Sequence, residues 1–514
     1  MGFRPWRLNS SAGAGWWFKQ HQGYILLSTV EQTRLRVSKS TEAKKKSQLG
    51  QFLTPVKTAA FMANLFPTST GNCYLLDAGA GIGSLSSTFL DRCINKELKF
   101  DEIRLTAFEL DDNIHADLYR SLFGYTNKMP ISFEIVGGDF IEAAVNRIQF
   151  GQEYFTHAIL NPPYKKINSD SRHRLLLRQI GIETVNLYSS FVALSLLLMS
   201  TGGQIVAIIP RSFCNGPYYR PFRDFMLERA AIRHMHLFES RSKAFRDDNV
   251  LQENIIIRLE RGGRQGSVVV STSTDDTFTD FTSHDYPFDR IVFPDDPERF
   301  IHIPTSPKKN AIESSAAIRC TLTDLGIKVS TGPVVDFRLK AHLRNMPEAG
   351  TVPLLYPSHF SNSGTIWPQT DTKKPNAIQH NCDTEKWLYP NGFYCVVRRF
   401  SSKEEKRRVV ASVVDPSAFN DSPMLGFENH LNVFHNNKHG LPKALAHGLA
   451  VYLNTTAVDE HFRRYSGHTQ VNATDLKRMK YPCRETLIKL GEWAMHREEL
   501  TQATIDEMLR TLTP

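Results

Sequence analysis

Cysteine is scarce in this chain. Only seven cysteines occur among 514 residues, an odd number, and no two of them form a C-x-x-C pair. This spacing excludes a disulfide-stapled scaffold and a four-cysteine zinc site, and it fits the reducing cytoplasm. We therefore expect a cytoplasmic protein that holds no metal.

Long apolar runs are also missing. The best candidate, residues 191–199, is far too short to cross a bilayer, so no membrane partner is expected. Residues 1–28 carry basic and aromatic side chains without the apolar core of a signal peptide, and we expect a poorly defined extension there. No G-x-x-x-x-G-K-[ST] loop is present, which argues against ATP dependence.

What the chain does contain is an ordinary globular composition with a basic excess. Hydrophobic residues make up 41% and charged residues 22%, which is enough apolar mass for a large core. The formal net charge is +9. An excess of this size is compatible with a polyanionic partner such as nucleic acid, although many other enzymes share it.

Apolar runs alternate with amphipathic stretches as far as residue 260. Short buried strands are predicted at residues 74–76, 105–108, 158–160 and 205–209, with helical patterns such as 188–199 between them. Strands that alternate with helices form a mostly parallel sheet, which places its ligands at the carboxyl ends of the strands. The fold class predicted for residues 29–260 is therefore α/β.

The rest of the chain has a different pattern. Residues 261–324 are rich in Ser, Thr, Asp and Pro and are predicted to be a connecting region that contains one or two hairpins. Residues 325–514 mix short strands, such as 352–356 and 393–397, with helical pieces at 442–453 and 485–512. This mixture indicates a second domain of α+β class.

Acidic residues follow three predicted strands in turn. They are Asp77, which opens the turn Asp77-Ala78-Gly79-Ala80-Gly81-Ile82-Gly83, then Glu109, and then Asp139. The glycines let the backbone approach a ligand closely, and Asp77 would repel a pyrophosphate but suits an ammonium group. Glu109 can accept both hydroxyls of a ribose, and Asp139 can accept from an adenine amine with Phe140 beside the ring.

This series resembles the S-adenosylmethionine-dependent methyltransferases of the Rossmann-like class, over roughly residues 48–260. By resemblance, Asp77 and Gly79 lie near the methionine moiety, Glu109 binds the ribose, and Asp139 with Phe140 holds the adenine. The segment from Gly50 to Pro55 looks like the family segment that closes over the methionine end; its alternative interpretation is a helix start capped by Pro55. The implied cofactor-binding residues are Phe52, Thr54, Pro55, Asp77, Ala78, Gly79, Gly81, Glu109, Leu110, Asp139 and Phe140.

The predicted strand at 158–160 leads into Asn161-Pro162-Pro163-Tyr164, which matches the motif of amino-methyltransferases. The amine of a base is flat and attacks poorly, because its lone pair is delocalised into the ring. Two acceptors at its N–H bonds favour a tetrahedral nitrogen and stabilise the developing positive charge. The Asn161 side-chain oxygen and the rigid Pro162 carbonyl can be these acceptors, and the Tyr164 ring can stack on the target base. The predicted catalytic residues are Asn161, Pro162, Pro163 and Tyr164.

Asn161 also indicates which base is methylated. By resemblance, amine-methylating enzymes that act on cytosine more often carry Ser at this position, so Asn161 favours adenine N6. Methylation of cytosine C5 would need a cysteine nucleophile, and the pair Pro482-Cys483 lies far outside this half of the chain. In similar enzymes an aromatic residue at this place stacks on the opposite face of the base, so the resemblance makes Phe245 the candidate; an ordinary buried phenylalanine is the alternative.

The order of closing segment, glycine turn, Asn-Pro-Pro-Tyr and long C-terminal region resembles the gamma group of adenine-N6 DNA methyltransferases, typical of type II restriction-modification systems. The resemblance implies a Rossmann-like methyltransferase sheet followed by a mixed α+β target-recognition domain at 325–514. It also implies S-adenosyl-L-methionine as cofactor, double-stranded DNA as substrate, flipping of the target adenine, and a possible restriction endonuclease on a separate chain. Basic and amide side chains at 398–408 and 461–472 suit DNA, but such clusters also form ordinary solvated faces.

Two other functions stay open. Amine methyltransferases that act on RNA or on protein glutamine share Asn-Pro-Pro-Tyr, but they are usually shorter and have no place for residues 325–514. A non-catalytic DNA-binding specificity subunit could keep the same fold, although the intact motif argues against it. A fused nuclease is not expected, because Glu404-x-Lys406 lacks a partner carboxylate after a strand.

Overall fold

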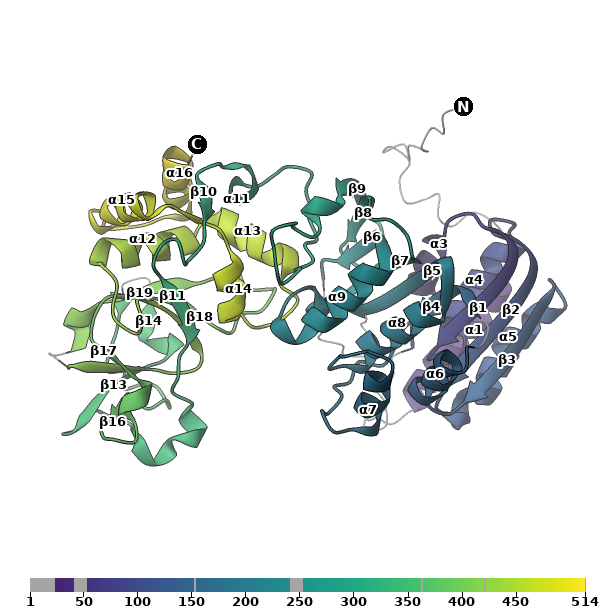
Figure 1. Cartoon of the computed structure of the whole chain (residues 1–514), viewed down its shortest axis with the longest axis horizontal. Coiled ribbons are helices and arrows are strands. Elements are labelled where there is room, and N and C mark those ends of the chain that lie inside the picture. The colour runs from purple at the N-terminus through teal and green to yellow at the C-terminus, as the bar shows by residue number, and fades with distance from the viewer. Residues whose placement is uncertain are drawn as a thin grey trace. The chain divides into compact units, whose positions relative to one another are not determined.

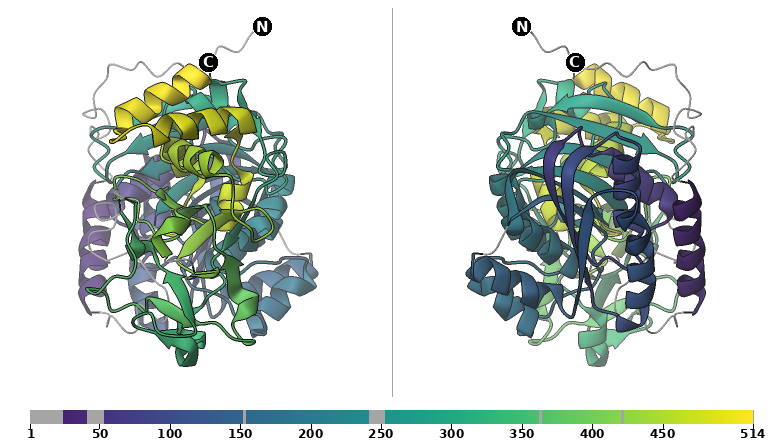
Figure 2. Two further views of the ribbon diagram at one scale, coloured as in Figure 1. Left: turned by 90° about the vertical axis from the view of Figure 1, so that its left-hand side faces the viewer. Right: turned by 90° about the vertical axis from the view of Figure 1, so that its right-hand side faces the viewer.

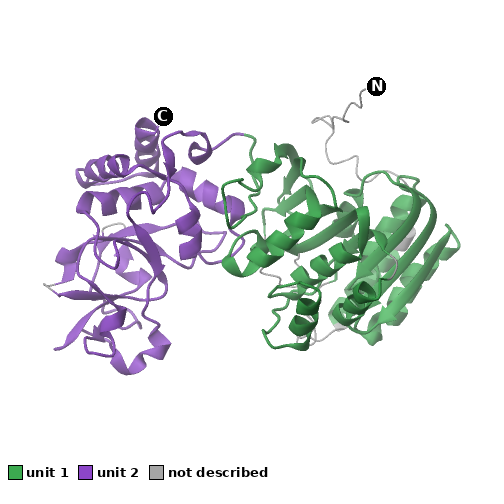
Figure 3. Ribbon diagram, in the orientation of Figure 1, with its two compact units in different colours: residues 1–307 green, residues 308–514 purple. Residues whose placement is uncertain are grey.

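The chain divides into two compact units, Met1–Pro307 and Lys308–Pro514 (Figure 3). The computed structural model describes residues 24–40, 53–151, 154–240, 253–361, 364–419 and 422–513. Each unit has its own sheets and its own hydrophobic core. The described ranges include no helix that is long and apolar enough to span a membrane.

The first unit is built on a nine-stranded sheet with the order β3-β2-β1-β4-β5-β7-β6-β8-β9. Strands β3 to β5 pair in parallel, whereas β7 is antiparallel to both β5 and β6. This confirms the predicted α/β class, and the chain order reverses at β1, where β2 lies on one side and β4 on the other. The strands are β1 (Thr70–Ala78), β2 (Lys99–Glu109), β3 (Ile131–Gly137), β4 (Phe155–Leu160), β5 (Met199–Pro210), β6 (Ala230–Phe238), β7 (Asn254–Arg261), β8 (Ser267–Ser273) and β9 (Thr282–Pro287).

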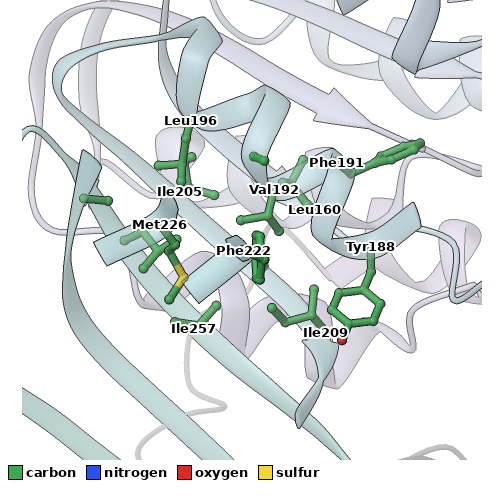
Figure 4. Close-up of a cluster of buried hydrophobic side chains, with 14 of the residues drawn as sticks. Leu160, Tyr188, Phe191, Val192, Leu196, Ile205, Ile209, Phe222, Met226 and Ile257 are labelled. Atoms are coloured by element: carbon green, nitrogen blue, oxygen red, sulfur yellow. The ribbon is translucent and has the colours of Figure 1, made fainter. Parts of the chain in front are cut away.

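Helices cover both faces of this sheet (Figures 1 and 2). Successive strand residues point to opposite faces, so Leu75 of β1 packs with α3, α4 and α5, whereas Leu76 packs with α6, α8 and α9. Figure 4 shows part of the hydrophobic core on the Leu76 face of the sheet, where Val192 and Phe222 lie near Ile205. The helices are α1 (Tyr24–Ser40), α3 (Val56–Asn64), α4 (Ser84–Ile94), α5 (His115–Thr126), α6 (Phe140–Gln149), α7 (Arg172–Gln179), α8 (Leu187–Leu198) and α9 (Arg220–Arg229).

The sheet extends into the region 261–324, which the sequence analysis treats as a connection. Strand β8 pairs with β6, and β9 pairs with β8, so both belong to the first unit. The buried face that β8 shares with β6 is partly polar: the ring nitrogens of His236 in β6 lie 2.9 and 3.2 Å from the hydroxyls of Ser271 and Ser273 in β8. The antiparallel pair β8–β9 is the kind of hairpin predicted for this region, but hydrophobic periodicity did not reveal that it joins the first sheet, because hydroxyl–imidazole hydrogen bonds replace apolar contacts here. The unit boundary falls after Pro307, ahead of the predicted residue 325.

The second unit combines small sheets with helices, which confirms the predicted α+β class. Its two larger sheets have the orders β11-β21-β18-β19 and β12-β16-β13-β20-β17. The strands are β10 (Ile318–Cys320), β11 (Lys328–Thr331), β12 (Leu343–Arg344), β13 (Thr351–Leu355), β14 (Phe360–Ser361), β15 (Gly364–Thr365), β16 (Ala377–Gln379), β17 (Leu388–Pro390), β18 (Tyr394–Arg398), β19 (Ala411–Val414), β20 (Met424–Phe427), β21 (Leu431–His435) and β22 (Tyr481–Pro482). The helices are α11 (Ala311–Ser314), α12 (Lys443–Leu453), α13 (Thr456–Tyr465), α14 (Ala473–Arg478), α15 (Arg484–Met495) and α16 (Gln502–Leu512).

The N-terminal prediction differs from the structure at one point. Helix α1 begins at Tyr24, inside the extension predicted for residues 1–28. Its buried residues Val30 and Val37 pack with Ile82 and Ile114 of the first unit. The last residues of the predicted extension therefore start a helix that belongs to the folded domain.

Candidate active site

Asp77 lies at the carboxyl end of β1 and is fully buried, with 0% exposure. Its Oδ2 accepts a hydrogen bond from the Ser86 hydroxyl at 2.5 Å, whereas its Oδ1 has no hydrogen-bond partner among the described residues. Burial raises the pKa of Asp77 to about 7, although the Ser86 hydrogen bond lowers it. A buried acceptor without a donor is costly, so Oδ1 is suited to the ammonium group of a ligand.

The glycine turn follows Asp77 directly. Gly79, Gly81 and Gly83 have φ angles of 83°, 59° and 84°, a left-handed conformation that favours glycine. Gly81 also lies against the preceding segment of the chain, because a Cβ there would come within 2.8 Å of Leu53 Cδ2. The turn is anchored to β2, since the amides of Gly79 and Ala80 both donate to the Phe108 carbonyl, at 2.9 and 2.8 Å.

Glu109 ends β2 and is buried. Its Oε2 accepts from the Gly81 amide and its Oε1 from the Asp111 amide, both at 2.8 Å. Burial raises the pKa of Glu109, while these backbone hydrogen bonds oppose the shift. The two oxygens of this carboxylate point to the end of β2, where a ribose hydroxyl would be accepted. The neighbouring Leu110, also predicted to bind the cofactor, is 54% exposed.

Asp139 follows β3 and caps α6. Its Oδ1 accepts from the amides of Ile141 and Glu142 at 2.8 and 3.1 Å, and its Oδ2 lies 2.9 Å from His173 Nε2. Burial raises the pKa of Asp139, but the hydrogen bonds from His173 and the two amides outweigh it and bring the pKa below its ordinary value. His173 belongs to α7, which lies 34 residues further along the chain, and nothing in the sequence pairs it with Asp139.

Phe140 is buried rather than open to a ligand. Its ring packs against those of Phe108 and Phe191, with centroids 5.0 and 4.7 Å away. Both Phe140 and Ala78 belong to the core that the α8 side of the sheet buries. Their side chains thus pack in the core beneath the carboxyl ends of the strands. The role of Phe140 beside an adenine ring stays a prediction.

Asn161 follows β4, which lies beside β1 in the sheet. A Cβ on Gly79 would lie 3.8 Å from the Asn161 carbonyl oxygen, so the motif and the glycine turn are neighbours. The Asn161 amide nitrogen donates to the Thr54 hydroxyl at 2.9 Å, which orients Oδ1 as the remaining acceptor. Pro162 is buried, whereas Pro163 is partly exposed.

Tyr164 turns its hydroxyl toward the same amide. The Tyr164 oxygen lies 3.0 Å from Asn161 Oδ1 and 3.2 Å from the Ile208 carbonyl, and its single proton can serve either acceptor. Burial raises the pKa of Tyr164 well above its ordinary value, so it stays a donor. The acceptor predicted to hold a substrate amine is therefore already in contact with a hydroxyl group of the protein.

The closing segment is only partly described. Thr54 is buried and contacts Asn161, and Pro55 immediately precedes α3, where its carbonyl accepts from the Ala59 amide at 2.9 Å. Pro55 thus takes the position of the helix-start alternative, while Thr54 joins the site. Phe52 and Phe245, both predicted site residues, lie outside the described residues.

The described residues fit S-adenosylmethionine. Asp77 Oδ1 offers a buried acceptor for an ammonium group, and Glu109 offers two oxygens at the end of the adjacent strand. The left-handed glycines between them leave no side chain that would block the approach. In the described part of the chain, no group of three or more His, Cys, Asp or Glu side chains could hold a metal ion, and none was predicted.

Several basic side chains that suited DNA in the sequence are structural in the second unit. Arg408 is buried, and its guanidinium donates to the Ser401 and Ser466 hydroxyls at 3.1 and 3.2 Å. Arg463 donates to the carbonyls of Lys403 and Glu405, both at 2.8 Å. Composition could not reveal this, because an arginine that binds carbonyls and one that binds phosphate look alike in sequence.

Comparison with known proteins gives consistent matches. The Eco57I restriction-modification methylase family matches residues 34–245. The type II methyltransferase M.BsuBI of Bacillus subtilis is 53% identical over 95% of this chain and 98% of its own length, and M.PstI of Providencia stuartii is 41% identical over 93% and 96%. A tRNA1(Val) (adenine(37)-N6)-methyltransferase of Shewanella woodyi is 24% identical over 40% of this chain and 84% of its own.

Full-length identity of this order extends over both units, so it includes the C-terminal half as well as the catalytic half. The site described above supplies the acceptors that a methyl donor with an ammonium group and a ribose requires. The chain therefore belongs to the type II methyltransferases of restriction-modification systems, which methylate DNA at a specific sequence with S-adenosylmethionine as methyl donor.

Proposed function

We propose that the methylated atom is the N6 amine of adenine in duplex DNA. The observation that carries this proposal is the position of Asn161 at the end of β4, against the glycine turn and with its amide oriented by Thr54. The Asn161 Oδ1 and the Pro162 carbonyl then accept from the two N–H bonds of the amine as positive charge develops on nitrogen. The adenine-N6 activity named for the Shewanella woodyi relative supports the same atom.

The remaining residues have roles that follow from their chemistry. When bound, S-adenosylmethionine supplies an activated methyl group. Asp77 holds its ammonium group, Glu109 accepts from the ribose hydroxyls, and Asp139 lies at the third strand end to accept from the adenine amine. The Tyr164 ring stacks on the flipped base once its hydroxyl leaves Asn161 Oδ1.

The second unit is proposed to be the target-recognition domain. Residues 308–514 form a separate unit with its own core. The matches to the type II methyltransferase relatives cover this unit in addition to the catalytic half. Base contacts and phosphate contacts from such a unit would select the sequence and hold the duplex while the target adenine is extruded. A restriction endonuclease that cuts the same sequence is proposed to be a separate chain.

The test transfers a labelled methyl group from S-adenosylmethionine to duplex DNA, to RNA and to protein, and identifies the modified nucleoside by mass spectrometry. N6-methyladenine in duplex DNA is expected. N4-methylcytosine, or label only in RNA or protein, would overturn the proposal, and binding of DNA without transfer would favour a specificity subunit. Sequencing of modified adenines in a host that expresses the protein then gives the recognition sequence.

The role of Asn161 is tested with Asn161→Ala and a matched control in the loop after the motif, Asn168→Ala. Asn168 is exposed and its side chain takes no part in the site. Loss of one transition-state acceptor is expected to lower kcat by about 100- to 1,000-fold while duplex DNA is still bound. The control variant keeps its kcat. Equal activity of both variants would show that the Asn161 amide is not the acceptor.

A further inference from the structure

The turn between β20 and β21 in the second unit holds a histidine against a buried carboxylate. Glu428 has 0% exposure, and His430 Nδ1 lies 2.6 Å from both of its oxygens. The His430 amide donates to Glu428 Oε2 at 2.8 Å. The His430 side chain is 40% exposed, and its Nε2 makes no hydrogen bond with the described residues. One ring nitrogen is thus fixed inside the fold and the other is left for a partner.

The backbone of this turn is tied down on three sides. The Glu428 amide donates to the Leu355 carbonyl at 3.0 Å, and the Asn429 amide donates to the Val334 carbonyl at 2.9 Å. Gly332 packs so closely that a Cβ there would lie 2.2 Å from the Glu428 carbonyl oxygen. The His430 ring therefore stands on a rigid frame, which is what a recognition group needs.

Other recognition groups surround the ring. The Phe400 ring lies 4.9 Å from the His430 ring, and the Arg399 amide donates to the His430 carbonyl at 2.8 Å. The Arg399 guanidinium donates to the Asn429 carbonyl at 3.1 Å and to Gln470 Oε1 at 3.3 Å, so it braces the turn and holds Gln470 beside it. Arg399, Phe400, His430 and Gln470 form what we call the His430 patch.

A structural role alone does not explain this arrangement. A surface histidine needs no internal partner, whereas a fully buried carboxylate is expensive unless it is paired, and an apolar side chain is often the more stable choice. We therefore attribute the burial of Glu428 to its effect on His430: it fixes the orientation of the imidazole ring. With Nδ1–H donated to Glu428, a neutral His430 presents Nε2 as an acceptor in a fixed direction, and a protonated one presents it as a donor.

We propose that His430 reads one base pair of the recognition sequence through Nε2 in the major groove, with Glu428 as its positioning residue. The proposal rests on sequence-specific DNA methylation and on the second unit as the reading domain. A neutral ring accepts from the exocyclic amine of adenine or cytosine, and a protonated ring donates to guanine O6 or N7. Phe400 supplies an apolar flank, and Arg399 holds Gln470 beside the ring as a further hydrogen-bonding group for a base edge.

The experiment uses the full-length enzyme and a set of duplexes. One duplex carries the recognition sequence found by genomic sequencing, and each of the others changes one of its base pairs. The ratio of kcat/KM between cognate and changed duplex is measured for wild type, His430→Ala and the matched control His439→Ala. His439 is an exposed histidine in the turn that follows β21, outside the patch.

His430→Ala is expected to lower discrimination by about tenfold to 100-fold at a single base pair and to leave the other positions unchanged. His439→Ala keeps the wild-type profile. An unchanged profile for His430→Ala, or an equal loss on every duplex, overturns the proposal. Failure of the proposed adenine methylation is distinguishable, because the wild-type enzyme would then leave no N6-methyladenine in any duplex.

The positioning role of Glu428 has a separate readout. Glu428→Gln is expected to lower discrimination at the same base pair and by less than His430→Ala, because the amide oxygen still accepts from Nδ1. The double variant should be no worse than His430→Ala alone, since both changes act through one contact. Thermal unfolding and S-adenosylmethionine affinity confirm that each variant is folded. Additive losses, or a loss at a different base pair, would show that Glu428 does not act through His430.

Discussion

Two buried carboxylates, one in each unit, differ in how their oxygens are used. Asp77 and Glu428 both have 0% exposure. Ser86 fills one oxygen of Asp77, and the other has no partner in the described residues, whereas both oxygens of Glu428 contact His430 Nδ1. The unsatisfied buried oxygen of Asp77 suits a cationic ligand, while the two oxygens of Glu428 hold the histidine beside them. The two carboxylates also differ in where they lie: Asp77 ends β1 beside the glycine turn, whereas Glu428 lies beside a surface histidine.

The largest effect expected from this comparison is that of Asp77→Asn. The change removes the charge that would meet an ammonium group, and the dissociation constant for S-adenosylmethionine should rise roughly 10- to 100-fold. The ligand-free variant should be at least as stable as wild type, because an unsatisfied charge has been removed. Isothermal titration calorimetry and chemical denaturation measure the two quantities.

Asp91→Asn provides the control for that experiment. Asp91 is buried in α4, accepts from the Tyr125 hydroxyl at 2.9 Å, and, like Asp77, has a pKa that burial raises to about 7. It lies outside the site, so its replacement should leave cofactor affinity unchanged. A similar loss of affinity in both variants would mean that any buried acid in this unit matters, and the comparison between ligand site and positioning pair would fail.

A smaller effect is expected from pH. The pKa of Asp77 is raised to about 7, so the carboxyl is ionised above that pH and neutral below it. Only the ionised form attracts an ammonium group, and affinity for S-adenosylmethionine should therefore fall about fivefold between pH 7 and pH 6, where the amine of the ligand stays protonated. Asp77→Asn should have a flat profile over the same range. Calorimetric titration at several pH values checks both curves; a flat wild-type profile would remove Asp77 from the ammonium site.

The smallest effect is expected from Tyr164→Phe, because the Tyr164 hydroxyl contacts the Asn161 Oδ1 only until the substrate amine binds. Tyr164→Phe removes the hydroxyl that contacts Asn161 Oδ1 and keeps the aromatic ring. Because the substrate amine no longer displaces a donor, kcat/KM on duplex DNA should rise about two- to threefold. Tyr164→Ala, which loses the stacking face as well, should lower it. Single-turnover methylation rates distinguish the cases, and an equal loss in both variants would assign the hydroxyl a necessary role.

The catalytic half could be predicted because its residues lie at strand ends. Parallel strands bring their carboxyl ends to one edge of a sheet, so Asp77, Glu109 and Asn161 meet although they are far apart in the chain. His173 could not be found in this way, because it comes from helix α7 and reaches Asp139 through a contact that no periodicity encodes. The pairing of β8 with β6 could not be predicted for a related reason. Its buried face contains serine and histidine, residue types that are also common in loops.

The recognition half could be assigned to a class but not to residues. Its strands contain between two and five residues, too few for a clear alternation of apolar and polar positions. The His430 patch gathers side chains from distant loops, and its buried Glu428 looks like any other acidic turn residue in the sequence. Only the structure distinguishes this surface patch from a buried basic residue such as Arg408, whose guanidinium hydrogen-bonds inside the unit.

Leu53 and Thr54 are consecutive residues with different contacts. Leu53 lies against Gly81 in the turn next to Asp77, and Thr54 holds the amide of Asn161. A larger residue at position 81 would displace Leu53, and one peptide bond would carry that displacement to the hydroxyl that aims Asn161. A redesign of this turn for a bulkier methyl-donor analogue must therefore include residues 53 and 54. Otherwise the Asn161 amide would no longer be oriented toward the target base.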